Sequence, residues 1–180
     1  MEKRTRRLVL VGCLSAMSFL LMYFAEFPLV PFFPPFLKYD PSGVPSLLAA
    51  LALGPGAGVA VEGVKGLLFA LSGKDPTGVL GPAAAFLAGG SMAFVAGLVY
   101  HRWRRNGRIW LALATGTLAS TVLMSLGNYF VFLPAYGVPR AQVTGMVTAV
   151  VLPFNLVKGI ITSLIVWAVA RRFRLENLGW

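Results

Sequence analysis

The sequence predicts an all-α integral membrane protein, built as a bundle of six transmembrane helices. Two observations lead to this prediction. Of the 180 residues, 57% are hydrophobic and only 12% are charged, whereas soluble domains carry about 25% charged residues. The apolar residues also gather into long segments, as spans through the hydrocarbon core of a bilayer require. We see no separate soluble region, so residues 1–180 are expected to form a single transmembrane domain.

The expected helices cover residues 8–27, 44–53, 57–71, 78–100, 109–133 and 147–170. The second of these is short, because ten helical residues rise only about 15 Å and the hydrocarbon core is about 30 Å thick. Gly54-Pro55-Gly56 separates it from the third and is expected to form a turn. The second segment therefore continues through this corner, tilts, or forms a partial hairpin with the third.

Basic residues cluster at the ends of these segments and predict the orientation. The clusters are Lys3, Arg4, Arg6 and Arg7, then Arg102, Arg104, Arg105 and Arg108, then Arg171, Arg172 and Arg174. With six spans all three clusters fall on one side of the membrane, and the positive-inside rule makes that side cytoplasmic. Both termini are then cytoplasmic. The net charge of +10 is explained in this way, and we do not expect a nucleic-acid partner.

The segment between the first two expected helices is a proline-rich loop. Five prolines between residues 28 and 41 rule out an ordinary helix, because each lacks an N–H donor and crowds the preceding turn. Lys38, Tyr39 and Asp40 follow on the extracytoplasmic side. A charged, aromatic loop between apolar segments is suited to cap a ligand. The alternative is a connecting loop whose aromatic residues anchor at the membrane interface.

Charged residues inside spans cost about 2.5–3.5 kcal/mol each at a helix centre, so they need a partner, a cavity or a ligand. Glu62 and Lys65 are spaced i,i+3 and share one helix face. We expect them to form an intramembrane ion pair.

Asn155 and Lys158 are also spaced i,i+3, but neither neutralises the other. Pro153 precedes them and is expected to kink the helix. Asn128 lies on the previous span at a similar depth, so the three polar side chains are expected to face one extracytoplasmic pocket. Aromatic and aliphatic walls with a few amides and a lysine suit a flat, amphipathic small molecule rather than an inorganic ion. The alternative is a polar contact between helices, worth about 0.6 kcal/mol.

The sequence lacks the motifs that are typical of several functional classes. The sequence has no phosphate-binding G-x-x-x-x-G-K-[ST], no H-E-x-x-H and no pairing of serine with histidine inside a span. The lone Cys13 excludes a disulfide framework, and the sole histidine, His101, lies beside a basic cluster. We therefore expect neither an enzyme nor a metal or cofactor site. Without an inverted repeat, a chain this small is expected to need a partner or an oligomer for transport.

The sequence resembles the riboflavin-specific (RibU-type) substrate-binding S components of energy-coupling factor (ECF) transporters over essentially its whole length. The resemblance rests on the order and spacing of several short motifs. They are Phe27-Pro28, Leu37-Lys38-Tyr39-Asp40-Pro41-Ser42-Gly43-Val44-Pro45, Glu62-x-x-Lys65, Asn128-Tyr129 followed by Pro134-Ala135-Tyr136, and Pro153-Phe154-Asn155-Leu156-Val157-Lys158-Gly159.

The resemblance implies six helices around an extracytoplasmic vitamin pocket, with the loop after the first helix as its cap. It implies that Asn128, Asn155 and Lys158 hydrogen-bond the ligand and that Tyr39 and Asp40 belong to the capping loop. Riboflavin is the implied ligand, and FMN is a second candidate. Gly43 departs from the family pattern, which usually has Asp at this position.

The resemblance also implies partners, namely a transmembrane coupling protein and two ATPase subunits in a bacterial cell membrane. Small residues of the first helix contact the coupling protein in this family, and the best pair here is Gly12 and Ala16. Two alternatives remain open at this point. One is an S component for another vitamin, such as biotin, thiamine or a pantothenate-like molecule. The other is a self-sufficient small-molecule carrier.

Overall fold

The computed structural model describes residues 2–29, 33, 37–103 and 109–172. The helices are α1 (Glu2–Phe24), α2 (Gly43–Leu53), α3 (Pro55–Leu71), α4 (Leu80–Arg102), α5 (Ile109–Gly127), α6 (Leu133–Ala135), α7 (Arg140–Met146) and α8 (Leu152–Arg172). Two π-helical turns, η2 (Asn128–Phe132) and η3 (Val147–Val151), join α5 to α6 and α7 to α8. The described residues therefore contain six helical segments, the number that the sequence predicts.

The helix bounds differ from the sequence prediction at both ends of the chain. The first helix covers Glu2–Phe24 rather than 8–27, because lysine and arginine are good helix formers and do not end a helix. The last helical segment begins at Arg140 rather than at 147 and continues to Arg172. Pro139 directly precedes it, and a proline is tolerated where no intrahelical N–H is needed.

Proline explains both π-helical turns. Pro134 and Pro153 each lie two residues beyond the end of a π-turn. A proline ring crowds the carbonyl four residues earlier and has no N–H to offer it. That carbonyl lies inside η2 in one case and inside η3 in the other. The wider turn accommodates the ring, so the helical segment continues past Pro153.

Four helical segments among the described residues are long and apolar enough to cross a membrane. They are Arg4–Phe24, Leu80–Arg102, Ile109–Ala135 and Arg140–Arg172. The helix α2, with 11 residues, is too short to do so alone. It forms a hairpin with α3: the corner is Gly54, whose φ of 107° suits glycine, and Pro55 opens α3. The hairpin interpretation of residues 44–71 is thus the one that the structure adopts.

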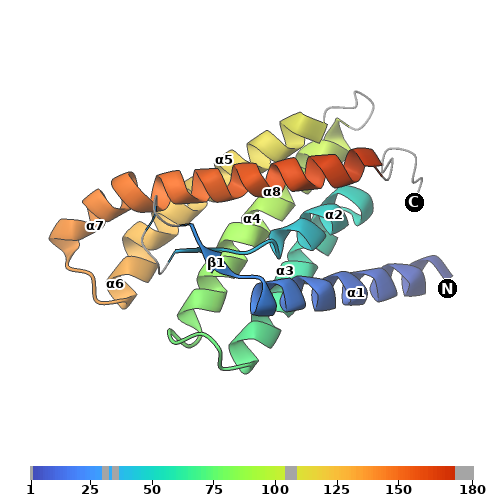
Figure 1. Ribbon diagram of the computed structural model, residues 1–180. Coiled ribbons are helices and arrows are strands. Elements are labelled where there is room, and N and C mark those ends of the chain that lie inside the picture. The colour runs from blue at the N-terminus through green and yellow to red at the C-terminus, as the bar shows by residue number, and fades with distance from the viewer. Residues whose placement is uncertain (1, 30–32, 34–36, 104–108, 173–180) are drawn as a thin grey trace.

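The helix ends next to the three basic clusters lie at one end of the bundle. Figure 1 shows the N-terminal end of α1, the C-terminal ends of α4 and α8 and the start of α5 together at this end. The largest apolar core joins α2, α4, α5 and α8 near this end, and it includes Leu51, Tyr100, Ile109 and Ala170. The opposite half of the bundle contains the cavity described below.

Close helix packing in this core depends on small residues. A Cβ atom added to Gly116 of α5 would lie 2.8 Å from the carbonyl oxygen of Met92 in α4. Only glycine permits two backbones to approach this closely, as is common between membrane helices.

The loop between α1 and α2 contains the only strands in the described part of the chain. Phe27–Pro28 (β1) pairs antiparallel with Lys38–Tyr39 (β2), with Phe27 opposite Tyr39. Of the residues between the strands, Phe33 packs its ring against Phe154 of α8 at 5.4 Å between centroids. This contact brings the described part of the loop against the last helix.

Candidate functional site

A cavity of about 570 Å³ opens between the loop, α3, α4, α5 and α8. Its size lies in the range of about 300–1,000 Å³ that is typical of small-molecule sites. The wall is mostly apolar, with Met22, Phe69, Met124 and Phe154 among its side chains. Four residues expected at the site from the sequence line this one cavity: Asp40, Asn128, Asn155 and Lys158.

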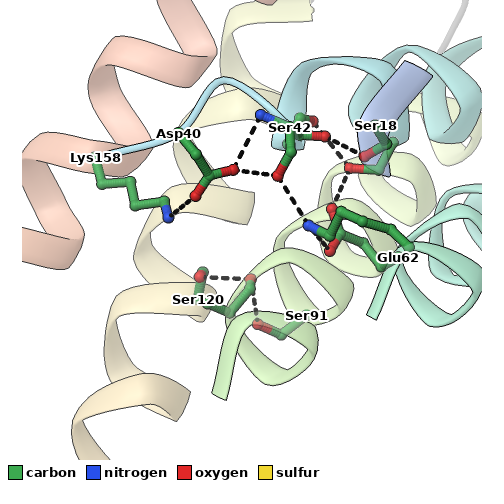
Figure 2. A network of polar contacts seen from close by, with 11 residues as sticks. Ser18, Asp40, Ser42, Glu62, Ser91, Ser120 and Lys158 are labelled. Carbon is green, nitrogen blue, oxygen red and sulfur yellow. Dashed lines mark hydrogen bonds and ion pairs between the residues drawn. The ribbon is translucent and has the colours of Figure 1, made fainter. Parts of the chain in front are cut away.

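Lys158, which Asn155 cannot neutralise, is paired with a carboxylate of the loop. Its Nζ lies 2.8 Å from Oδ2 of Asp40 (Figure 2). The two residues are 118 positions apart in the chain, so only the fold brings them together. Burial by itself raises the pKa of Asp40, but the charges of Lys158 and Lys65 outweigh it and hold that pKa well below its ordinary value.

The Asp40 carboxylate also shapes the start of α2. Its Oδ1 accepts hydrogen bonds from the backbone N–H of Ser42, at 3.1 Å, and from the Ser42 hydroxyl. This arrangement is an Asx turn, in which a side chain replaces a backbone acceptor. Asp40 therefore fixes the capping loop to α8 through Lys158 and to α2 through Ser42.

From Asp40 a buried polar network continues into the bundle (Figure 2). Lys65 Nζ donates to the Ser42 hydroxyl at 3.1 Å and lies 2.5 Å from Glu62 Oε2. The Ser46 hydroxyl donates to Glu62 Oε1 at 2.6 Å. Two lysines and two carboxylates thus balance to zero charge, which is the condition for burying them. We call Asp40, Ser42, Ser46, Glu62, Lys65 and Lys158 the buried polar network.

Neighbouring helices hold this network in place. The Ser18 hydroxyl of α1 donates to the Ser42 carbonyl at 2.5 Å (Figure 2). Gly89 of α4 lies so close to Glu62 that an added Cβ would be 2.4 Å from its carboxylate carbon. The ion pair of Glu62 and Lys65 is therefore enclosed by α1, α2 and α4, and it lies behind the cavity rather than at its surface.

Asn128 and Asn155 are held by their own helices. Asn128 Nδ2 donates to the carbonyl of Met124 at 2.9 Å, and Asn155 Nδ2 donates to that of Val151 at 2.8 Å. Asn128 begins η2, and Asn155 bonds to the last residue of η3. Irregular π-turns are frequent at functional sites. Both amides are thus held in one orientation by their own helices, and such preorganisation lowers the entropy cost of any binding in which a side chain takes part.

At the exposed edge of the cavity, three further charged residues meet, which we call the mouth cluster: Glu26, Lys38 and Lys74. Both lysine Nζ atoms lie 3.0 Å from the same oxygen, Oε1 of Glu26. Lys74 also donates to the Tyr23 carbonyl and lies over the Tyr23 ring. Partial burial raises the pKa of Glu26, but the two lysines outweigh it, so the pKa lies below its ordinary value.

Sequence reasoning assigned no role in the site to Glu26 or Lys74. The signal in the sequence that could have identified them was the sparse, mixed charge on the side opposite the basic clusters. Sequence reasoning likewise assigned no role to Asp75, which accepts hydrogen bonds from the backbone N–H and the hydroxyl of Thr77. Tyr136, after α6, contacts Thr77, and burial is the main reason why the pKa of its hydroxyl is raised.

Tyr39 does not line the cavity. Successive residues of an extended strand point to opposite sides, so Lys38 and Asp40 face the cavity and Tyr39 faces away. Its ring packs on Phe27 at 5.5 Å, and no described residue hydrogen-bonds its buried hydroxyl. Tyr39 thus packs within the loop and is not among the residues that line this cavity.

The small residues of α1 lie on its open face. Gly12 and Ala16 are exposed, and no heavy atom lies within 4 Å of a Cβ added to Gly12. The described part of the chain therefore leaves this face of α1 uncovered.

Comparison with known proteins places the chain in a family. The sequence model of the ECF transporter substrate-specific component matches residues 6–170. The riboflavin transporter RibU of Staphylococcus aureus (strain TCH60) is 38% identical, over 94% of this chain and 91% of the relative. The riboflavin transporter FmnP of Bacillus subtilis (strain 168) is 36% identical, over 90% and 88% of the two chains.

The fold agrees with these sequence matches. A solved structure of the S component of a bacterial ECF transporter superposes with a TM-score of 0.81 and 39% identity, covering 95% of this chain and 96% of the other. The chain therefore belongs to the family of substrate-specific components of ECF transporters.

Proposed function

We propose that this chain is the riboflavin-binding membrane subunit of an ECF-type uptake transporter. The relatives that match nearly its whole length are riboflavin transporters. The observation that carries the proposal is the meeting of Asp40, Asn128, Asn155 and Lys158 in one cavity of about 570 Å³. Its apolar wall suits a flat ring system, and its amides and charges suit the heteroatoms of that ring and a polyol side chain.

We assign Asn128, Asn155 and Lys158 to direct ligand contact. The amide oxygens accept hydrogen bonds, and Lys158 donates one. Asp40 has two roles in this proposal, because it orients Lys158 and offers its own carboxylate to a ligand hydroxyl. Tyr39 supports the loop from behind.

The topology and partners of the proposal follow from the charge pattern and the family. We place both termini in the cytoplasm of a bacterial cell, with six helical segments, of which α2 and α3 form a short hairpin that returns to the side from which it starts. The cavity then opens outward, away from the basic clusters. A coupling protein and two ATPases supply the energy, because this chain has no phosphate-binding loop. The subunit is a transporter component, not an enzyme, and riboflavin is its cargo rather than a cofactor.

The deciding experiment is a fluorescence-quenching titration of the detergent-purified chain with riboflavin. We expect saturable quenching at nanomolar riboflavin, unaffected by excess biotin, thiamine or pantothenate. Displacement of riboflavin by one of these vitamins, or the absence of quenching by a folded protein, would contradict the proposal.

The partner contact has a separate test in cells that express the coupling protein and the ATPases. We expect Ala16→Leu to abolish riboflavin uptake while the purified variant still binds riboflavin, because a bulky side chain prevents close helix approach. Normal uptake by Ala16→Leu would place the coupling contact elsewhere.

A further inference from the structure

Every lysine that lines the cavity in the described part of the chain is already paired with a carboxylate. Lys158 lies 2.8 Å from Asp40, and Lys38 and Lys74 each lie 3.0 Å from Glu26. The third carboxylate of the lining, Asp75, accepts its hydrogen bonds from Thr77. Three lysines and three carboxylates give this lining a formal charge of zero.

A phosphate monoester is a charged ligand whose needs can be compared with what this neutral lining offers. It carries a charge of about −1.5 to −2 at neutral pH and takes its strongest hydrogen bonds from lysine or arginine. At the buried end of this cavity it would meet Asp40 beside Lys158. At the mouth it would meet Glu26 between two lysines. In either place a carboxylate occupies the position that the phosphate needs.

At the mouth of the cavity, a single residue, Glu26, decides whether the lysines are free to bind a phosphate group. The two ammonium groups come from separate elements, β2 and the connection between α3 and α4, and converge on one oxygen atom of Glu26. Without the Glu26 charge, these two ammonium groups would face the cavity entrance together. A pair of convergent ammonium groups beside solvent is a suitable receptor for a phosphate group.

We propose that Glu26 makes the cavity selective for an uncharged ligand over the phosphate monoester of the same ligand. Given the proposed function, on which this inference rests, Glu26 favours riboflavin over FMN. Glu26 acts by occupying both mouth lysines, and the apolar wall and the amides then select for the ring system that the two ligands share.

The test compares the dissociation constants of riboflavin and FMN for the purified chain and for Glu26→Gln. We expect the unaltered protein to bind FMN more weakly. In Glu26→Gln the ratio of the FMN constant to the riboflavin constant should fall about tenfold, as one charge-assisted hydrogen bond contributes. Because the gain is electrostatic and lies near solvent, it should shrink as the salt concentration rises.

Two control variants distinguish the effect of freeing the mouth lysines from the effect of changing the net charge of the lining. Asp75→Asn removes the same charge from the cavity lining but frees no lysine, so the ratio should change much less. Adding Lys74→Met to Glu26→Gln removes one of the freed ammonium groups and should return the ratio toward that of the unaltered protein.

The outcomes distinguish this inference from the proposed function. If the unaltered chain does not bind riboflavin, the proposed function fails, and this inference fails with it. If the chain binds riboflavin, the inference alone is overturned by either of two results: equal affinities of the unaltered protein for FMN and riboflavin, or an equal change of the ratio in Glu26→Gln and Asp75→Asn.

Discussion

The buried polar network and the mouth cluster contain the same chemical groups in different surroundings. In the network, the side chains of Glu62 and Lys65 are 0% and 3% exposed. In the mouth cluster, those of Glu26 and Lys38 are 21% and 47% exposed. Removing one partner of a buried pair leaves a charge that water cannot reach, whereas water replaces a lost partner at the surface.

This difference indicates different uses of the two groups. We expect the loss of one charge from the network to destabilise the bundle strongly, and Asp40 links the network to Lys158 at the cavity. We expect the mouth cluster to contribute little to stability, so it can be altered without loss of the fold. It is therefore the region in which selectivity for a ligand can change most easily.

The largest expected effect concerns Glu62→Gln. This change leaves the Lys65 ammonium buried without its counter-charge and should lower the free energy of unfolding by about 3–5 kcal/mol. Denaturant unfolding in mixed micelles measures it. The matched control is Glu62→Gln combined with Lys65→Met, which removes both charges and should recover most of the loss. A double variant as unstable as the single one would contradict the pairing argument.

The next largest effect is on ligand affinity. Lys158→Ala removes a charged donor from the cavity and should weaken riboflavin binding by about 1.5–3 kcal/mol, which is about ten- to a hundredfold in the dissociation constant. The quenching titration measures it, and an unfolding curve verifies that the variant is folded. Unchanged affinity in a folded Lys158→Ala protein would remove Lys158 from the site.

A small effect is expected at the mouth. Lys38→Met breaks a half-exposed ion pair and should change the free energy of unfolding by no more than about 1 kcal/mol. The same unfolding experiment applies, with Glu62→Gln measured beside it. If Lys38→Met lowered the free energy of unfolding as much as Glu62→Gln does, burial would not explain the expected difference in stability between the buried polar network and the mouth cluster.

The smallest expected effect is that of pH. The pKa values of Asp40 and Glu26 lie below their ordinary values of 3.8 and 4.5, so both groups stay ionised well into the acid range. A lowered carboxylate pKa adds stability above the ordinary pKa, and this stability is lost as the pH falls through the folded pKa. Riboflavin affinity should therefore be constant between about pH 8 and pH 5. A progressive loss across that interval would contradict the assigned ionisation of these pairs.

The sequence by itself predicted the membrane bundle, the approximate helices and the polar residues that share a cavity. Long apolar segments, terminal basic clusters and rare polar residues in spans are local signals, because the bilayer imposes the same requirement on every segment. The positions of Asn128, Asn155 and Lys158 could be inferred in this way, since equal depth on neighbouring helices brings side chains together. The family resemblance of the motifs added riboflavin to this prediction.

The i,i+3 spacing predicted the ion pair of Glu62 and Lys65, which the structure contains, but only the tertiary structure decided which charges pair between different elements. Asp40 and Lys158 are far apart in the chain, and Glu26 selects two lysines from different elements, so no local spacing indicates these contacts. The direction of Tyr39 depended on the register of a two-residue strand, where a shift of one position reverses every side chain. Helix periodicity and hydropathy fix where a residue lies along the bilayer. The identity of its partner depends on how the loop and the helices pack, and that is set by the whole fold.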